Sequence, residues 1–274
     1  MGSIHVGVSG WSYDRWRGDF YPADLPRRRW LSYVAGRMTS VELNGSFYSL
    51  QRPATYRTIV EQTEPGFPVA VKGGRYVTHM KRLRDVEAPL ANFYASGVLL
   101  LGDQLGPVLW QLPSSLQYDE ELVASFLVLL PRDHAAAAEL AARHDDKLPG
   151  DRAVTTASAT GSLRHAIEPR HASFGSDAAV ALLREHDVAL VTSDSPGSWP
   201  CFDEQTGDLR YVRLHGHSEL YASGYAPASL DRWAERLQEW AGSGQECYVY
   251  FDNDARGRAP HDAVGLLERI GANP

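Results

Sequence analysis

Short segments in which apolar and polar residues alternate recur along the whole chain. The first, Ile4–Ser9, places Ile, Val and Val on one face of a strand and His, Gly and Ser on the other. Later segments repeat this alternation or form short apolar runs that end in a polar residue. The expected strands are Ile4–Ser9, Ser40–Asn44, Phe67–Lys72, Pro107–Gln111, Leu163–Arg170, Val188–Asp194, Arg210–His215 and Cys247–Asp252.

Between these strands, apolar residues recur every three or four positions, as on one face of a helix. Ser229–Gly242 has the clearest stripe, and the alanine-rich Asp133–His144 is a strong helix former. The apolar run at 97–101 fits either a strand or a buried helix, and we assign it to helix. The expected helices are Arg27–Arg37, Ala54–Thr63, Pro89–Leu105, Asp119–Leu130, Asp133–His144, Asp177–His186, Ser229–Gly242 and Pro260–Ile270.

Eight strands, each followed by at least one helix, predict an α/β fold, a single (β/α)8 TIM barrel over residues 1–274. A doubly wound open sheet is the alternative, but it rarely needs eight such regular units. No segment has the composition of a linker between two cores, and 274 residues with 43% hydrophobic content suffice for one large core.

Charge and cysteine content limit the binding partners and the cellular compartment that we expect for the protein. A formal net charge of −7 disfavours a surface that binds polyanions over its whole extent. Two cysteines, far apart in sequence, do not form a disulfide framework and fit a reducing compartment. The chain enters a strand directly and has no run of about 18 apolar residues, so we expect a cytoplasmic protein without membrane contact. Its oligomeric state stays open.

Large aromatic residues cluster in the loop that follows the first strand. A loop residue of this size left in water forfeits roughly 1.5–3 kcal/mol of burial, so the loop is expected to line a cleft. We expect Trp11 and Tyr13 to face a pocket, while Trp16, Phe20 and Tyr21 anchor the loop on the rim.

In a TIM barrel, functional side chains come from the carboxyl ends of the strands and the loops after them. Polar residues and aromatics at these positions predict a concave polar floor with stacking walls. The alternative is that they satisfy one another and the loop backbone. The candidate ligand-binding residues are Trp11, Tyr13, Asn44, Tyr48, Lys72, Gln111, Arg170, Asp194, Arg213 and Asn253.

Glu42 and Glu168 are the candidate acid–base carboxylates, because each sits on the inward period of its strand. His215 joins them as a candidate catalytic residue that could also hold an anion. The alternative is a pair of salt bridges from the glutamates to Lys72 and Arg170, which could instead bind an anion themselves.

Two further patterns are weaker. The spacing of His215 and His217, with Asp194 and Glu168 on neighbouring strands, makes a divalent-metal site conceivable, but we do not expect one. The segment 72–84 carries five basic residues and no acid, which suits phosphate or single-stranded nucleic acid or is a solvated loop.

At several ordered motifs the chain resembles the DUF72 family, also called YecE-like. The motifs include GVSGWSYDRWRGDFYP, VELNGSFY, LGPVLWQLP, HAIEPRH, YVRLHG and FDND, and they span nearly the whole length. The resemblance implies a TIM barrel, distantly similar to the metal-dependent barrels of endonuclease IV and xylose isomerase, and no settled activity. It singles out Trp11, Tyr13, Glu42, Asn44, Phe47, Tyr48, Lys72, Gln111, Glu168, Arg170, His215 and Asn253; Pro169 replaces a usually bulkier apolar residue.

These observations favour an enzyme, of hydrolase or isomerase type, that acts on a small anionic or sugar-like ligand: a phosphorylated compound, a sugar or a nucleotide. The alternative is a non-catalytic module that binds a nucleic acid, a nucleotide or another protein through the same basic and aromatic residues. The fold alone cannot choose between these functions.

Overall fold

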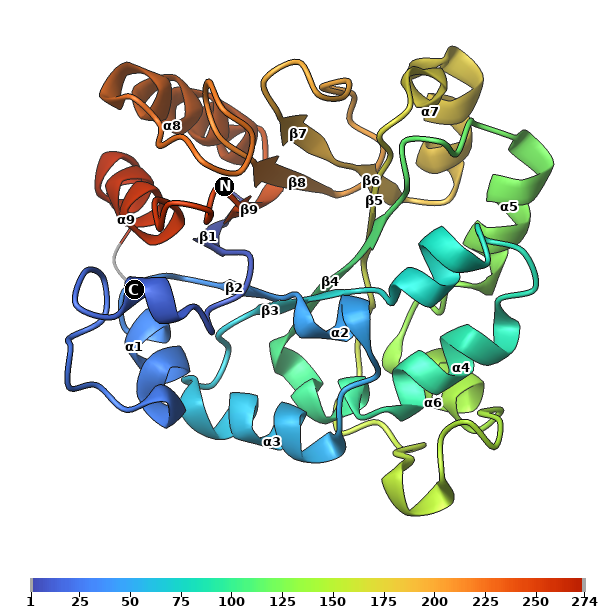
Figure 1. Ribbon diagram of the computed structural model, residues 1–274. Helices are drawn as coiled ribbons and strands as arrows, with labels where there is room; N and C mark the ends of the chain where they lie inside the picture. Colours follow the sequence, from blue (N-terminus) through green and yellow to red (C-terminus); the bar gives the residue numbers. More distant parts are fainter. Residues whose placement is uncertain (1, 273–274) are drawn as a thin grey trace.

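The computed structural model describes residues 2–272, in which parallel strands form the centre and helices lie around them (Figure 1). The strands form two parallel sheets, ordered β1-β9-β8-β7 and β2-β3-β4-β5-β6. Their bounds are β1 Ile4–Val8, β2 Val41–Leu43, β3 Val69–Lys72, β4 Leu105–Gln111, β5 His165–Glu168, β6 Val188–Leu190, β7 Thr192–Asp194, β8 Leu209–Leu214 and β9 Glu246–Phe251.

The two sheets join at two seams and complete the barrel. The expected strand Val188–Asp194 is interrupted at Val191, so that its first half, β6, pairs with β5 and its second half, β7, pairs with β8. At the other seam a parallel bridge links Ser9 to Glu42, and Gly10 N–H donates to Glu42 O at 2.9 Å. The predicted (β/α)8 barrel is thereby confirmed.

Gly7 explains why β1 and β2 can approach closely at this seam. A Cβ atom at this position would lie 2.0 Å from the backbone oxygen of Ser40. Only glycine leaves room for the neighbouring backbone.

The helices surround the barrel and bury its outer face. Their bounds are α1 Trp30–Ala35, α2 Gly45–Tyr48, α3 Pro53–Gln62, α4 Glu87–Ala95, α5 Glu120–Leu129, α6 His134–Ala141, α7 Asp177–Glu185, α8 Pro227–Gly242 and α9 Ala259–Ile270. Asp119 and Asp133 cap α5 and α6, each accepting a backbone N–H three residues later. Within residues 2–272 no helix has the length and apolarity to cross a membrane.

The expected helix Pro89–Leu105 is wrong in its second half. α4 ends at Ala95, and Gly97 adopts a φ of +118°, which favours glycine and breaks the helix. A 3-10 segment, Val98–Gln104, then leads into β4, which begins two residues before the expected strand.

Alternation along the strands separates two cores. Outward residues such as Val6, Val108 and Trp110 pack under the helices, with zero exposed surface. Inward residues form a second cluster, in which tyrosines from β8 and β9 meet small and aliphatic residues of the other sheet. This interior cluster fills the barrel and supports the polar layer above it.

Candidate functional site

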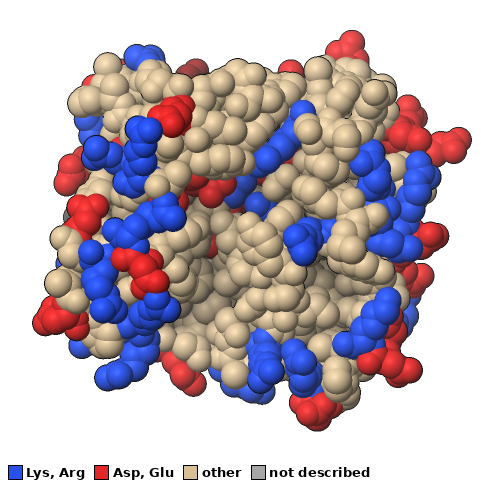
Figure 2. Space-filling view, viewed as in Figure 1, with Lys and Arg blue, Asp and Glu red and all other residues tan. Residues whose placement is uncertain are grey.

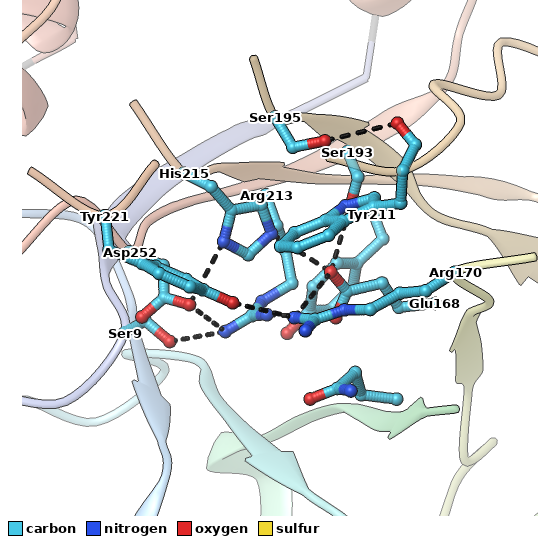
Figure 3. Close-up of polar contacts among 12 residues, drawn as sticks. Ser9, Glu168, Arg170, Ser193, Ser195, Tyr211, Arg213, His215, Tyr221 and Asp252 are labelled. Carbon is cyan, nitrogen blue, oxygen red and sulfur yellow. Dashed lines mark hydrogen bonds and ion pairs between the residues drawn. The ribbon is translucent and has the colours of Figure 1, made fainter. Parts of the chain in front are cut away.

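Arg213 is the centre of the polar layer at the carboxyl end of the barrel (Figure 3). It is the next inward position on β8 after Tyr211, and its side chain is fully buried. Nη1 donates to Glu168 Oε2 at 2.9 Å, and Nη2 donates to Glu42 Oε1 at 2.8 Å and to Asp252 Oδ2 at 3.2 Å. One guanidinium therefore holds three carboxylates, from β2, from β5 and from just after β9.

Glu42 has no exposed surface, and its donors surround it. Tyr211 OH donates to Oε2 at 2.6 Å, Arg213 Nε donates to the same oxygen at 3.2 Å, and Ser9 Oγ donates to Oε1. Asn44 Nδ2 donates to Ser9 Oγ at 2.7 Å and so connects this carboxylate to the layer above.

Glu168 is equally buried, and its carboxylate oxygens contact side chains from β7, from β8 and from the residue after β8. Ser193 Oγ donates to Oε1 at 2.9 Å, and His215 Nε2 lies 3.0 Å from the same oxygen. Burial alone would raise the pKa of Glu168, but the charge of Arg213, followed by the hydrogen bond to His215, holds that pKa well below its usual range.

These contacts change the interpretation of the two glutamates. Their principal cation is Arg213. Arg170 Nη2 lies 3.7 Å from Glu168, and among residues 2–272 neither glutamate forms an ion pair with Lys72. Both carboxylates are sealed from a ligand above the layer. Their acid–base role stays a prediction, and it would require this cluster to open.

Above the polar layer lies the barrel-mouth cavity, with a volume of about 920 Å³. Figure 2 shows a hollow near the centre of this face with charged atoms inside it. Cations and aromatic rings share its wall. The lining residues are Tyr13, Asn44, Phe47, Tyr48, Lys72, Arg75, His79, Met80, Gln111, Arg170, Tyr221, Asp252, Asp254 and Ala255.

Lys72 is the inward residue at the end of β3 and is 7% exposed. Its Nζ lies 4.5 Å from the centre of the Phe47 ring. Burial first, and then the charge of Arg213, lower the pKa of Lys72 to about 8, although Glu42 and two other carboxylates oppose the shift. A substantial fraction of this amine is therefore neutral near pH 8.

Arg170 is held at the cavity wall by two aromatic side chains. Its guanidinium lies 3.9 Å from the centre of the Trp199 ring, and Nη2 donates to Tyr221 OH at 3.1 Å (Figure 3). Arg75 reaches the rim and lies 6.0 Å from the Tyr48 ring. A planar guanidinium fixed in this way is suited to a carboxylate or phosphate.

Asp252, Asp254 and His79 are cavity residues that we did not single out from the sequence. Asp252 follows Tyr248 and Tyr250 on the inward period of β9, so alternation was a usable signal for it. Burial would raise its pKa, but Arg213 and then His215 lower it to about 2. Burial raises the pKa of Asp254 to about 6.

His79 gave no comparable signal, because it lies on a π-helical turn at Tyr76–Met80. Burial and the charge of Lys72 lower its pKa to about 4, so its imidazole is neutral at physiological pH. Gln111 Nε2 lies 3.4 Å from its Nε2.

Four of the expected ligand residues do not line the cavity. Arg213 is fully buried in the polar layer below it. Asp194 faces α8, where Trp233 Nε1 donates to it at 3.4 Å, since Ser193 takes the inward position. Asn253 is buried against α9 and donates to Asp262 Oδ2 at 2.7 Å. Trp11 lines a neighbouring cleft of about 610 Å³, beside Arg27 and Arg28, which shares Tyr13 and Asn44 with the barrel-mouth cavity.

The structure also locates the residues of the two weaker sequence patterns, the conceivable metal site and the basic segment 72–84. Among residues 2–272, no group of three or more His, Cys, Asp or Glu side chains is placed to hold a metal ion. Of the basic segment 72–84, Lys72 and Arg75 line the cavity, whereas Arg82 bonds Ser115 and Lys81 lies 3.7 Å from Asp85.

Trp16, Phe20 and Tyr21 are buried and anchor the first loop.

The comparisons with known proteins agree on one family. The family model described as "Protein of unknown function DUF72" matches residues 5–274. A DUF72 family protein from Thermotoga maritima is 24% identical, with a TM-score of 0.77, over 98% of this chain and 99% of that chain. Another from Enterococcus faecalis is 16% identical, with a TM-score of 0.74, over 99% and 96%. None of the curated proteins matches this chain.

Proposed function

The chain belongs to the DUF72 family, a family of unknown function, and from the geometry of its barrel-mouth cavity we propose that it is an enzyme acting on a small phosphorylated ring compound, such as a sugar phosphate or a nucleotide. The observation that carries this proposal is the wall of the cavity, where Arg170, Arg75 and Lys72 face aromatic side chains. Its volume of about 920 Å³ suits one such molecule.

In this proposal Arg170 and Arg75 bind the anionic group, and Tyr13, Tyr48 or Tyr221 stacks on the ring. Lys72 and Asp252 face the reacting part of the ligand, as a hydrolase or isomerase requires for proton transfer. Glu42, Glu168 and His215 are assigned as positioning residues, because they hold Arg213 and Asp252 from below.

A second candidate is the binding of a nucleotide or short nucleic acid without catalysis. It is favoured by the neighbouring cleft, where Arg27 and Arg28 extend the basic surface past Tyr13 and Asn44. Such binding would weaken steeply with added salt, whereas a single phosphate would show a shallow dependence. Both cysteines are free thiols, which supports a cytoplasmic location as part of either proposal.

Calorimetric titration tests the proposed function. AMP and ribose 5-phosphate should bind about tenfold or more tightly than adenosine and ribose, and Arg170→Gln should remove this preference. The matched control is Arg143→Gln, since Arg143 forms an exposed ion pair with Glu87 and does not line the cavity. Equal affinity for phosphorylated and unphosphorylated compounds would contradict the proposal.

A further inference from the structure

We propose that Lys72 is a nucleophile and that the ligand carries an aldehyde or ketone, which the Nζ amine attacks to form a covalent imine. This inference rests on the proposed function and narrows its substrate class to phosphorylated carbonyl compounds. Four features of Lys72 carry it: its place, its lack of a polar partner, its surroundings and its residue type.

The backbone of Lys72 is fixed at the floor of the cavity. It pairs with Leu109 of β4, and Ser46 Oγ donates to its carbonyl oxygen at 2.7 Å. The side chain then passes beside Phe47 and reaches the cavity that Arg170 and Tyr221 also line. A ligand whose anion lies on Arg170 would thus place another part of itself over Nζ.

Nζ has no hydrogen bond or ion pair anywhere in the described chain, which is unusual for a buried lysine. The carboxylates below it, Glu42, Glu168 and Asp252, are all engaged by Arg213. The lysine is therefore not a structural counter-ion, and its amine is left free for a ligand.

The charges around Lys72 suit both forms that an imine-forming amine must adopt. Burial and then the charge of Arg213 favour the neutral nucleophile, and the pKa of about 8 reflects their balance against the nearby carboxylates. Glu42, Asp252 and Glu168 lie close enough to act on the same nitrogen and would stabilise the positive charge of a protonated imine.

Residue type adds an independent argument. The chain has 27 basic residues, of which only Lys72, Lys81 and Lys147 are lysine. For anion binding alone an arginine would suffice, and arginine is the commoner basic residue of this chain. Arginine, however, cannot lose its proton at physiological pH. A lysine is needed where a neutral amine must form.

The reaction is balanced without an oxidant or reductant. The neutral amine attacks the carbonyl carbon, a C–N bond forms, and the C–O bond of the resulting carbinolamine breaks. The oxygen leaves as water with one proton from the amine and one from solvent, and the nitrogen keeps its other proton in the iminium. Hydrolysis reverses each step.

Reductive trapping tests the inference, with pyridoxal 5′-phosphate as the carbonyl probe and borohydride as the reductant. Peptide mass mapping should find Lys72 labelled about tenfold or more faster than exposed Lys147 near neutral pH, because the pKa of Lys72, about 8, is well below the ordinary lysine value. Its labelling should rise with a midpoint near pH 8. Pyridoxal without phosphate should label it poorly, and inorganic phosphate should protect it.

Two variants separate the outcomes. Lys72→Arg should lose the cavity label, and Lys147→Arg should leave both AMP binding and the labelling of Lys72 unchanged. If AMP binds but the label follows exposure and spares Lys72, the imine is overturned and the proposed function stands. If phosphorylated compounds neither bind nor direct the label, both proposals are overturned.

Discussion

Arg213 on β8 and Glu168 on β5 form a fully buried ion pair, with 2.9 Å between Nη1 and Oε2, although β6 and β7 lie between them in the sheet order. The same guanidinium also reaches Glu42 and Asp252. The carboxyl end of the barrel is therefore held together by one cation among three carboxylates, and that arrangement has measurable consequences.

Replacing Arg213 should strongly destabilise the protein. Arg213→Met leaves Glu42 and Glu168 buried without their cation, and breaking a buried pair from one side costs about 3–5 kcal/mol. Urea denaturation measures this loss. The exposed pair of Arg143 and Glu87 provides the control, because Arg143→Met should cost no more than about 1 kcal/mol. Equal effects of the two substitutions would refute the central role of Arg213.

Stability should fall as the pH is lowered through the acidic range. The folded-state pKa of Glu168 lies well below its ordinary value, and that of Asp252 is about 2. Near pH 4 the unfolded chain thus binds protons that the folded chain does not, so stability is complete above about pH 5 and declines below it. Glu168→Gln should flatten the slope of unfolding free energy against pH between about 3 and 5. An unchanged slope would show that Glu168 is not held ionised by Arg213.

Asp254 should act in the opposite direction. Its folded-state pKa of about 6 exceeds its ordinary value, because burial disfavours the carboxylate, so its ionisation destabilises the folded protein as pH rises from about 4 to above 6. The stability difference between wild type and Asp254→Asn should therefore shift by on the order of 2 kcal/mol between pH 4 and pH 7. Paired urea titrations at both pH values measure the shift, and a constant difference would contradict it.

Gly7 should be irreplaceable at the seam between β1 and β2. In Gly7→Ala the new Cβ would meet Ser40 O at 2.0 Å, and the backbones would have to separate, at a cost of about 3 kcal/mol or more. Gly242→Ala is the matched control, since a Cβ there meets open space at the end of α8 and should be neutral or slightly stabilising. Thermal unfolding compares the two, and a stable Gly7→Ala barrel would mean that the seam is looser than described.

Much of the fold followed from the sequence because two periods, of two and of about 3.6 residues, dominate it. The same alternation correctly turned Glu42, Lys72, Gln111, Glu168 and Arg213 toward the barrel axis. It would also have found Ser193 in place of Asp194, and Asp252 in place of Asn253. At both positions we selected the neighbouring residue for its functional group, although the alternation indicated the other residue.

Other features of the site had no local signal. That Arg213, and not Lys72 or Arg170, binds Glu42 depends on the distance between strands remote in sequence. The packing of His79 into the cavity depends on the π-helical turn Tyr76–Met80, which the sequence of this segment does not predict. The break at Gly97 follows from a backbone angle, and from the nearby Pro53 Cα that would lie 2.9 Å from a Cβ.

The most direct test of the account is a crystal structure of the protein grown with AMP. We predict that its phosphate lies in the barrel-mouth cavity within hydrogen-bonding distance of the Arg170 guanidinium, with the Arg213 cluster unchanged below it. A phosphate bound only outside this cavity, or an adenine ring in the position we assign to the phosphate, would contradict the central claim.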